Sequence, residues 1–175
     1  GGIRVFPDDF IYQVKELSEK NNILLCFDEV QTGIGRTGNL FAHQRWDLSP
    51  DIVATAKGLG GGFPVGACLS TAKVAAGMMP GTHGSTFGGN PLAMAAGNAV
   101  IDTILGDKFL EKVVNLGEKL KYYLNKIKFR HKGKLEEIRG RGLMIGLKFN
   151  DSTEGLVDLL RNNGLLTVPA GDNVI

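Results

Sequence analysis

Asp28 and Lys57 are the two residues whose types and positions suggest chemistry, because each one follows an apolar run. Residues 23–27 (ILLCF) precede Asp28, and the mostly apolar residues 52–56 (IVATA) precede Lys57. Apolar runs without polar alternation are typical of strands that are covered on both faces in a parallel sheet. Parallel strands end at the same edge of a sheet, where open α/β proteins place their ligands. The pattern therefore predicts an acid and an amine at one cleft.

An acid and an amine at one cleft suit chemistry on a carbonyl compound. A lysine amine that loses hydration in an apolar site can condense with a carbonyl carbon. Pyridoxal phosphate needs such an amine, together with a carboxylate that keeps its ring nitrogen protonated. The alternative, on spacing alone, is that both residues are ordinary solvated charges at the ends of secondary-structure elements.

The segments around these two residues supply the connections that a parallel sheet needs. Residues 32–38 (TGIGRTG) form a glycine-rich loop, and residues 40–46 can form a helical crossover, which is normally right-handed. The glycines of residues 58–62 either cradle an anion through backbone N–H groups or let the chain reverse behind Lys57. We favour the reversal, which leads to a third, antiparallel or edge strand over residues 65–69.

Helices are predicted on both sides of this region. Pro7 and the two acids after it predict a helix start, and the helix should end near residues 21–22, with Phe10, Val14 and Leu17 packed against the sheet. The polar residues 81–91 (GTHGSTFGGNP) lead into a second helix over residues 92–105. Helix N-termini bind phosphates, but a plain surface turn is the alternative for this segment.

The second half of the chain is predicted to hold a linking helix and a small α+β domain. We expect a helix within residues 106–134, capped by Asp107, with Gly117 in its apolar stripe to allow close contact. Residues 135–175 should contain a half-buried strand over 143–149, a helix capped by Ser152 and ended by Gly164, and a strand over 165–168. The remaining residues, 1–105, are assigned to the larger domain.

Three long motifs carry a resemblance to a known family. They are residues 27–38 (FDEVQTGIGRTG), residues 56–67 (AKGLGGGFPVGA) and residues 83–93 (HGSTFGGNPLA). In this order and at this spacing they closely resemble the class III aminotransferases, which depend on pyridoxal phosphate. The resemblance implies an α/β fold of fold type I, with part of the large, mostly parallel sheet domain and part of the small α+β C-terminal domain.

The resemblance also implies roles for individual residues near the two strand ends. Lys57 matches the lysine that forms a Schiff base with the cofactor, and Asp28 matches the partner of its pyridinium nitrogen. Val30 matches the residue packed on one ring face, Gln31 the one that hydrogen-bonds the phenolic oxygen, and Glu29 lies among the cofactor-binding residues.

Two further matches imply a homodimer. Thr86 matches the residue that holds the cofactor phosphate of the neighbouring subunit, and Ser85 matches a position that contacts substrate. The same comparison implies a longer chain, because the first half of the large domain, its main phosphate loop and a carboxylate-binding arginine fall outside these residues. A noncatalytic piece that lacks part of its active site is therefore an alternative to an active enzyme.

Within the family, the motifs are most similar to those of members that exchange the amino group of N-acetylornithine with 2-oxoglutarate in arginine biosynthesis. Succinyldiaminopimelate is a possible further substrate of this branch. Members that act on ornithine, succinylornithine or 4-aminobutyrate share much of these motifs, and they remain alternatives.

Composition adds several exclusions. The chain has 175 residues, 43% of them hydrophobic, and a formal charge of +2, which does not favour a nucleic-acid or membrane partner. The basic stretch over residues 119–134 suggests a nucleic-acid patch, but we favour a solvated helix face.

Cys26 and Cys68 lie in apolar runs, which predicts buried, reduced thiols in the cytoplasm. The three histidines, at positions 43, 83 and 131, are scattered, so no metal site is predicted.

Overall fold

The computed structural model describes residues 2–175, which form two compact units. The first unit is Phe6–Glu111, and the second combines Lys112–Ile175 with the described residues up to Val5. The division falls inside helix α4 (Phe109–Arg130), which the sequence analysis had assigned to a separate linking segment.

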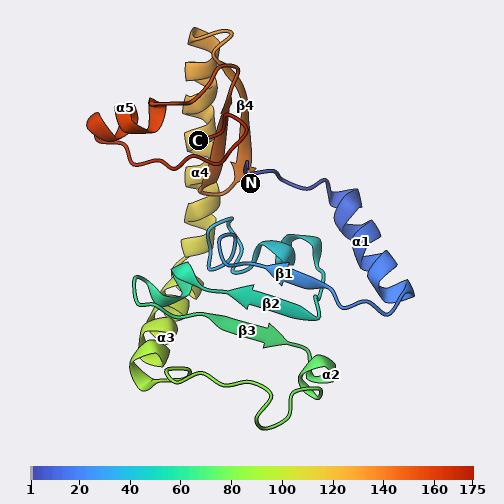
Figure 1. Ribbon diagram of the computed structural model, residues 1–175. Coiled ribbons are helices and arrows are strands. Elements are labelled where there is room, and N and C mark those ends of the chain that lie inside the picture. The colour runs from blue at the N-terminus through green and yellow to red at the C-terminus, as the bar shows by residue number, and fades with distance from the viewer. Residues whose placement is uncertain (1) are drawn as a thin grey trace. The chain divides into compact units, whose positions relative to one another are not determined.

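A three-stranded sheet organises the first unit. Its strands are β1 (Cys26–Asp28), β2 (Ile52–Thr55) and β3 (Ala67–Ser70), in the order β1-β2-β3 (Figure 1). β1 and β2 are parallel, with Cys26 opposite Ile52 and Asp28 opposite Ala54. β3 is antiparallel to β2. The predicted parallel pair and the predicted antiparallel third strand are both confirmed.

The prediction that the first apolar run is a buried strand is wrong for most of that run. Ile23 and Leu24 lie outside β1 and are 60% and 53% exposed. β1 and β3 are the two edges of the sheet, and within residues 2–175 no strand pairs with their outer sides. Cys26 and Cys68, predicted to be buried, are consequently exposed, although both thiols are free as predicted.

A short connection joins β1 to β2. The predicted helical crossover is a single 3₁₀ turn, η1 (Ala42–Trp46), reached through the glycine-rich loop. Behind β2, the chain forms a second 3₁₀ turn, η2 (Lys57–Gly60). η2 contributes Leu59 to a buried apolar cluster with Ile34 and Ile104. This cluster anchors the segment that carries Lys57.

Helix α1 (Asp8–Lys20) begins and ends where the sequence predicts, but it buries a different face. Phe10 and Leu17 are 46% and 60% exposed, whereas Ile11 is buried. The helix is held to η1 by polar contacts, in which Trp46 Nε1 donates to Asp8 Oδ1 over 2.8 Å. α1 therefore does not place its predicted apolar stripe on the sheet.

Two further helices complete the first unit. α2 (Ala72–Ala75) is one turn long, and α3 (Pro91–Leu105) is the second predicted helix. Asn90 caps α3 by accepting a hydrogen bond from the Ala93 N–H over 2.9 Å, and Pro91 occupies the first turn. Gly97 lies at the middle of α3, where an added Cβ would be 3.7 Å from the Leu59 carbonyl oxygen.

The second unit is built on an antiparallel hairpin of β4 (Leu135–Arg141) and β5 (Met144–Phe149). α4 packs against the hairpin turn so closely that a Cβ added at Gly117 would be 2.3 Å from the Gly142 carbonyl oxygen. Gly117 does allow a close approach, but its partner is the hairpin turn, whereas the prediction was a close helix contact. Asp107 does not begin the helix, which starts at Phe109.

The last part of the second unit differs from prediction in two places. The residue before α5 (Leu156–Asn162) is Gly155, which has φ +73° and occupies the N-cap position that was predicted for Ser152. The Ser152 hydroxyl instead accepts a hydrogen bond from the Glu154 N–H. No strand forms over 165–168, where Leu166 is 82% exposed and lacks a partner strand in the described chain. Instead, Ile175 exchanges backbone hydrogen bonds with Leu147 of β5.

Candidate active site

Asp28 and Lys57 lie at the carboxyl edge of the sheet, where the parallel strands β1 and β2 both end. Asp28 is opposite Ala54 in the parallel register, and the Glu29 N–H extends the pairing by donating to the Ala54 carbonyl over 2.8 Å. Lys57 begins η2 directly after the residue that follows β2. The predicted placement of an acid and an amine at one carboxyl edge is therefore confirmed.

The backbone at Lys57 is unusual for a residue with a side chain. Its φ is +50°, in the left-handed region that favours glycine, and the preceding Ala56 is extended. Gly61 and Gly62, also at positive φ, then turn the chain back toward β3. The buried Leu59 holds this turn, while the Lys57 side chain is exposed. The glycines thus make the reversal that the sequence analysis favoured.

The Asp28 carboxylate is exposed and only partly occupied. Its Oδ1 atom accepts a hydrogen bond from the Val30 N–H over 3.0 Å. Among residues 2–175, neither Asp28 nor Lys57 forms an ion pair. Asp28 Oδ2 is thus able to accept a hydrogen bond from a protonated ring nitrogen, and the Lys57 amine is accessible to a carbonyl carbon. Both groups fit pyridoxal phosphate.

Glu29 points away from this edge into the protein. The residue is 1% exposed. Its Oε1 atom accepts hydrogen bonds from the backbone N–H of His43 over 2.9 Å and faces His43 Nδ1 at 3.0 Å, and its Oε2 atom accepts from the Thr32 hydroxyl. Successive residues of an extended segment point to opposite sides, so Asp28 and Glu29 cannot face one ligand together. Glu29, predicted among the cofactor-binding residues, is already occupied by protein groups.

His43 and Thr32 are the residues near this edge that the sequence analysis did not single out. The sequence indicates their role only indirectly. Alternation after the strand turns Glu29 inward, and a buried carboxylate requires hydrogen-bond donors.

The other predicted site residues fall in two places. Val30 is half-buried and Gln31 is exposed, both directly after Asp28. Ser85 and Thr86 are exposed in the irregular segment between α2 and α3. Within the described part of the chain, no hydrogen bond joins either of them to Asp28, Gln31 or Lys57.

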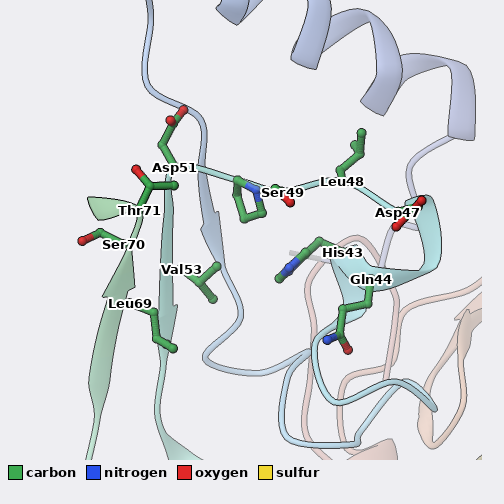
Figure 2. A pocket seen from close by; sticks show the side chains of 11 residues that line it. His43, Gln44, Asp47, Leu48, Ser49, Asp51, Val53, Leu69, Ser70 and Thr71 are labelled. Carbon is green, nitrogen blue, oxygen red and sulfur yellow. The ribbon is translucent and has the colours of Figure 1, made fainter. Parts of the chain in front are cut away.

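A separate hollow lies beside η1. It has a volume of about 530 Å³ and is bounded by η1, the segment after it, and strands β2 and β3. Figure 2 shows His43 and Gln44 on one side, Val53 and Leu69 on another, and Asp51 with Thr71 at one end. Neither Asp28 nor Lys57 lines it, so it is distinct from the candidate site. Among residues 2–175, no cluster of three histidine, cysteine or acidic side chains suits a metal ion.

The chain belongs to the class III aminotransferase family, which matches residues 1–175. Members of this family use pyridoxal phosphate. The chain is 51% identical over all 175 residues to an acetylornithine aminotransferase of Brucella melitensis, and 52% identical to acetylornithine aminotransferase 1 of Bradyrhizobium diazoefficiens. It spans 43% of the length of each of these relatives.

Solved structures of the same family share this fold. Plasmodium falciparum ornithine δ-aminotransferase superposes with a TM-score of 0.91 at 33% identity, over 99% of this chain and 46% of that one. Acetylornithine aminotransferase from Elizabethkingia anophelis gives a TM-score of 0.89 at 38% identity, over 97% of this chain and 46% of that one. The predicted family and the predicted fold-type I class are both confirmed. No helix in residues 2–175 is long and apolar enough to span a membrane.

Proposed function

We propose that the protein carrying this chain is a pyridoxal-phosphate-dependent aminotransferase that moves an amino group from N-acetylornithine to 2-oxoglutarate. The observation that carries the proposal is the convergence of Asp28 and Lys57 at one edge of a parallel strand pair. The identity of 51% to a relative named acetylornithine aminotransferase supports the choice of substrate. A place in arginine biosynthesis follows from that substrate.

Each residue at the edge has a distinct task in the proposed reaction. When bound, pyridoxal phosphate supplies an electron sink for the carbon that loses its proton. Lys57 Nζ would hold the cofactor and, once released, would move the proton as general base and acid. The Asp28 carboxylate would keep the ring nitrogen protonated. Val30 would pack on the ring, and the Gln31 amide would donate to its phenolic oxygen.

We propose that a second copy of the protein completes the site. Ser85 and Thr86 lie in an exposed polar segment, and within residues 2–175 neither is hydrogen-bonded to the Asp28 edge of its own chain. Their hydroxyl groups suit the substrate and the phosphate, respectively, of the neighbouring subunit. The protein is then a homodimer. Its free, exposed Cys26 and Cys68 suit a reducing compartment, which we take to be the cytoplasm.

The role of Lys57 is tested by trapping the cofactor. The full-length protein carrying this chain is mixed with pyridoxal phosphate, reduced with borohydride and digested. Mass spectrometry should find the reduced cofactor on the peptide that contains Lys57, and Lys57→Ala should remove it. Lys20→Ala, an exposed lysine at the end of α1, serves as the matched control. Trapping elsewhere at the wild-type yield in Lys57→Ala would refute the assignment.

The substrate is tested separately, by coupled assays with 2-oxoglutarate. N-acetylornithine should give a higher kcat/KM than ornithine, succinylornithine or 4-aminobutyrate. Succinyldiaminopimelate is included as a possible second substrate. A clear preference for ornithine or 4-aminobutyrate would keep the aminotransferase chemistry and overturn the proposed substrate.

A further inference from the structure

Glu29 and His43 form a buried contact directly behind the candidate site. Their side chains are 2% and 9% exposed, and Glu29 Oε1 lies 3.0 Å from His43 Nδ1. In the tautomer that carries its hydrogen on Nδ1, the imidazole donates to the carboxylate oxygen at this distance. The backbone N–H of His43 donates to the same oxygen over 2.9 Å. One residue of η1 thereby supplies two donors to one buried carboxylate oxygen.

The imidazole ring is held in place by two aromatic side chains. Its centroid lies 5.5 Å from that of Phe27 and 5.7 Å from that of Phe41, and the planes of the second, stacked pair are nearly parallel, 14° apart. Figure 2 shows the ring pointing from η1 toward Val53 of β2. The two aromatic contacts hold the plane of the ring, and the hydrogen bond to Glu29 fixes the direction of Nδ1 within that plane.

Glu29 is also hydrogen-bonded through its backbone at the end of β1, so it links His43 to the strand end. Its N–H donates to the Ala54 carbonyl of β2 over 2.8 Å, and its carbonyl accepts from the Gly33 N–H over 2.9 Å. Glu29 is therefore tied to η1 through its side chain, and to β2 and the glycine-rich loop through its backbone. Asp28 is the residue directly before it, so any shift of Glu29 also shifts the Asp28 peptide.

We infer that His43 is a positioning residue, which holds Glu29 and thereby fixes the direction in which Asp28 meets the ring nitrogen of pyridoxal phosphate. This inference rests on the proposed function. Among residues 2–175, His43 forms no hydrogen bond with Asp28 or Lys57, so its effect on the cofactor is transmitted through Glu29. A purely structural role would lower stability without a specific effect on cofactor affinity.

Two substitutions separate the donor from the ring. His43→Phe keeps an aromatic ring beside Phe27 and Phe41 but removes the Nδ1 donor. His43→Asn removes the ring but keeps an N–H donor near the Nδ1 position. Ile11→Ala is the control for a general loss of stability, because Ile11 is buried on α1. The full-length protein and its variants are titrated with pyridoxal phosphate by absorbance, and urea unfolding is measured on the same preparations.

The expected result is a weaker affinity in one variant only. His43→Phe should raise the Kd for pyridoxal phosphate about fivefold or more, because a buried carboxylate loses a charged hydrogen bond. His43→Asn and Ile11→Ala should stay within about twofold of wild type. A wild-type Kd in a folded His43→Phe variant overturns the inference. If His43→Phe does not fold, His43→Asn decides: a Kd within twofold supports the donor role, and a fivefold loss overturns it.

Failure of the proposed function gives a different result. In that case borohydride traps no cofactor on Lys57 in the wild-type protein, whatever the His43 variants do. Trapping on wild-type Lys57 combined with an unchanged Kd in His43→Phe refutes the role of His43 alone.

Discussion

Gly117 and Gly97 offer a matched test of the packing described above, because both are buried glycines inside α-helices. A Cβ at Gly117 would lie 2.3 Å from the Gly142 carbonyl oxygen and 2.7 Å from its carbonyl carbon. A Cβ at Gly97 would lie 3.7 Å from the Leu59 carbonyl oxygen, which is an ordinary contact. The same substitution by alanine therefore clashes with backbone in one helix and makes only an ordinary contact in the other.

The expected magnitudes follow from two opposing effects. Alanine in place of glycine favours a helix by up to about 1 kcal/mol at both positions. At Gly117, overpacking against backbone costs about 1–3 kcal/mol, since the hairpin turn must move away from α4. Because the added Cβ would meet backbone at 2.3 Å, the upper part of that range applies, about 2–3 kcal/mol, and after a helix gain of about 1 kcal/mol Gly117→Ala should lower the free energy of unfolding by about 1–2 kcal/mol. Gly97→Ala should leave it unchanged or raise it by up to about 1 kcal/mol.

Urea unfolding followed by far-ultraviolet circular dichroism measures both values, and hydrogen exchange shows where protection is lost. In Gly117→Ala, protection should fall in the peptides of β4 and β5, next to the displaced turn. The reasoning is refuted if Gly117→Ala is as stable as wild type, or if Gly97→Ala is equally damaging. The second outcome would mean that glycine is needed for a reason unrelated to the measured contacts.

Two further predictions concern α3. Ile104→Ala should cost about 2–4 kcal/mol of unfolding free energy, because Ile104 belongs to the buried apolar cluster, whereas Leu105→Ala, at a 60% exposed residue, should change it by less than about 0.5 kcal/mol. Similar losses in urea unfolding would contradict the assignment of that cluster as the core. Asn90→Ala should cost about 1 kcal/mol by removing the cap on the Ala93 N–H, and the exposed Asn98→Ala, within the same helix, should cost nothing in thermal unfolding. An equal effect of the two asparagine variants would show that the cap does not stabilise α3.

The placement of Asp28 and Lys57 was predictable because it depends on local patterns. Two apolar runs, each followed by a charged residue, predict two strands, and the segment between them is long enough for a parallel connection. The α3 boundary was predictable for a similar reason, since Asn90 and Pro91 favour a helix start through their own backbone chemistry.

Burial was less predictable, because an apolar residue shows a preference for an apolar environment without showing which segment supplies it. Ile23, Leu24 and Cys26 are apolar, yet they lie beside or in an edge strand and are exposed. The predicted strand over 165–168 failed for the same reason, because β-favouring residues form a strand only when a partner strand is available. The apolar pattern of a segment shows its tendency to form a buried strand, and the presence of a partner strand decides whether that strand forms.

The direction of Glu29 required a different kind of reasoning. The family resemblance grouped it with Asp28 as a cofactor contact, whereas its side chain turns inward to His43 and Thr32. Alternation at a strand end predicts opposite directions for adjacent residues, but it does not identify the distant donor. His43 lies in η1, and its position depends on the fold of the whole glycine-rich loop.

The left-handed backbone at Lys57 means that this position is poorly suited to the residue that occupies it. Glycine would adopt φ +50° without strain, whereas a residue with a Cβ does so at a cost of about 1 kcal/mol or more. Other non-glycine residues of the described chain, such as Ile34, also have a positive φ, so the backbone conformation alone does not mark a functional residue. Under the proposed function, the amine that bonds the cofactor lies at a position where a change to glycine would lower the backbone strain.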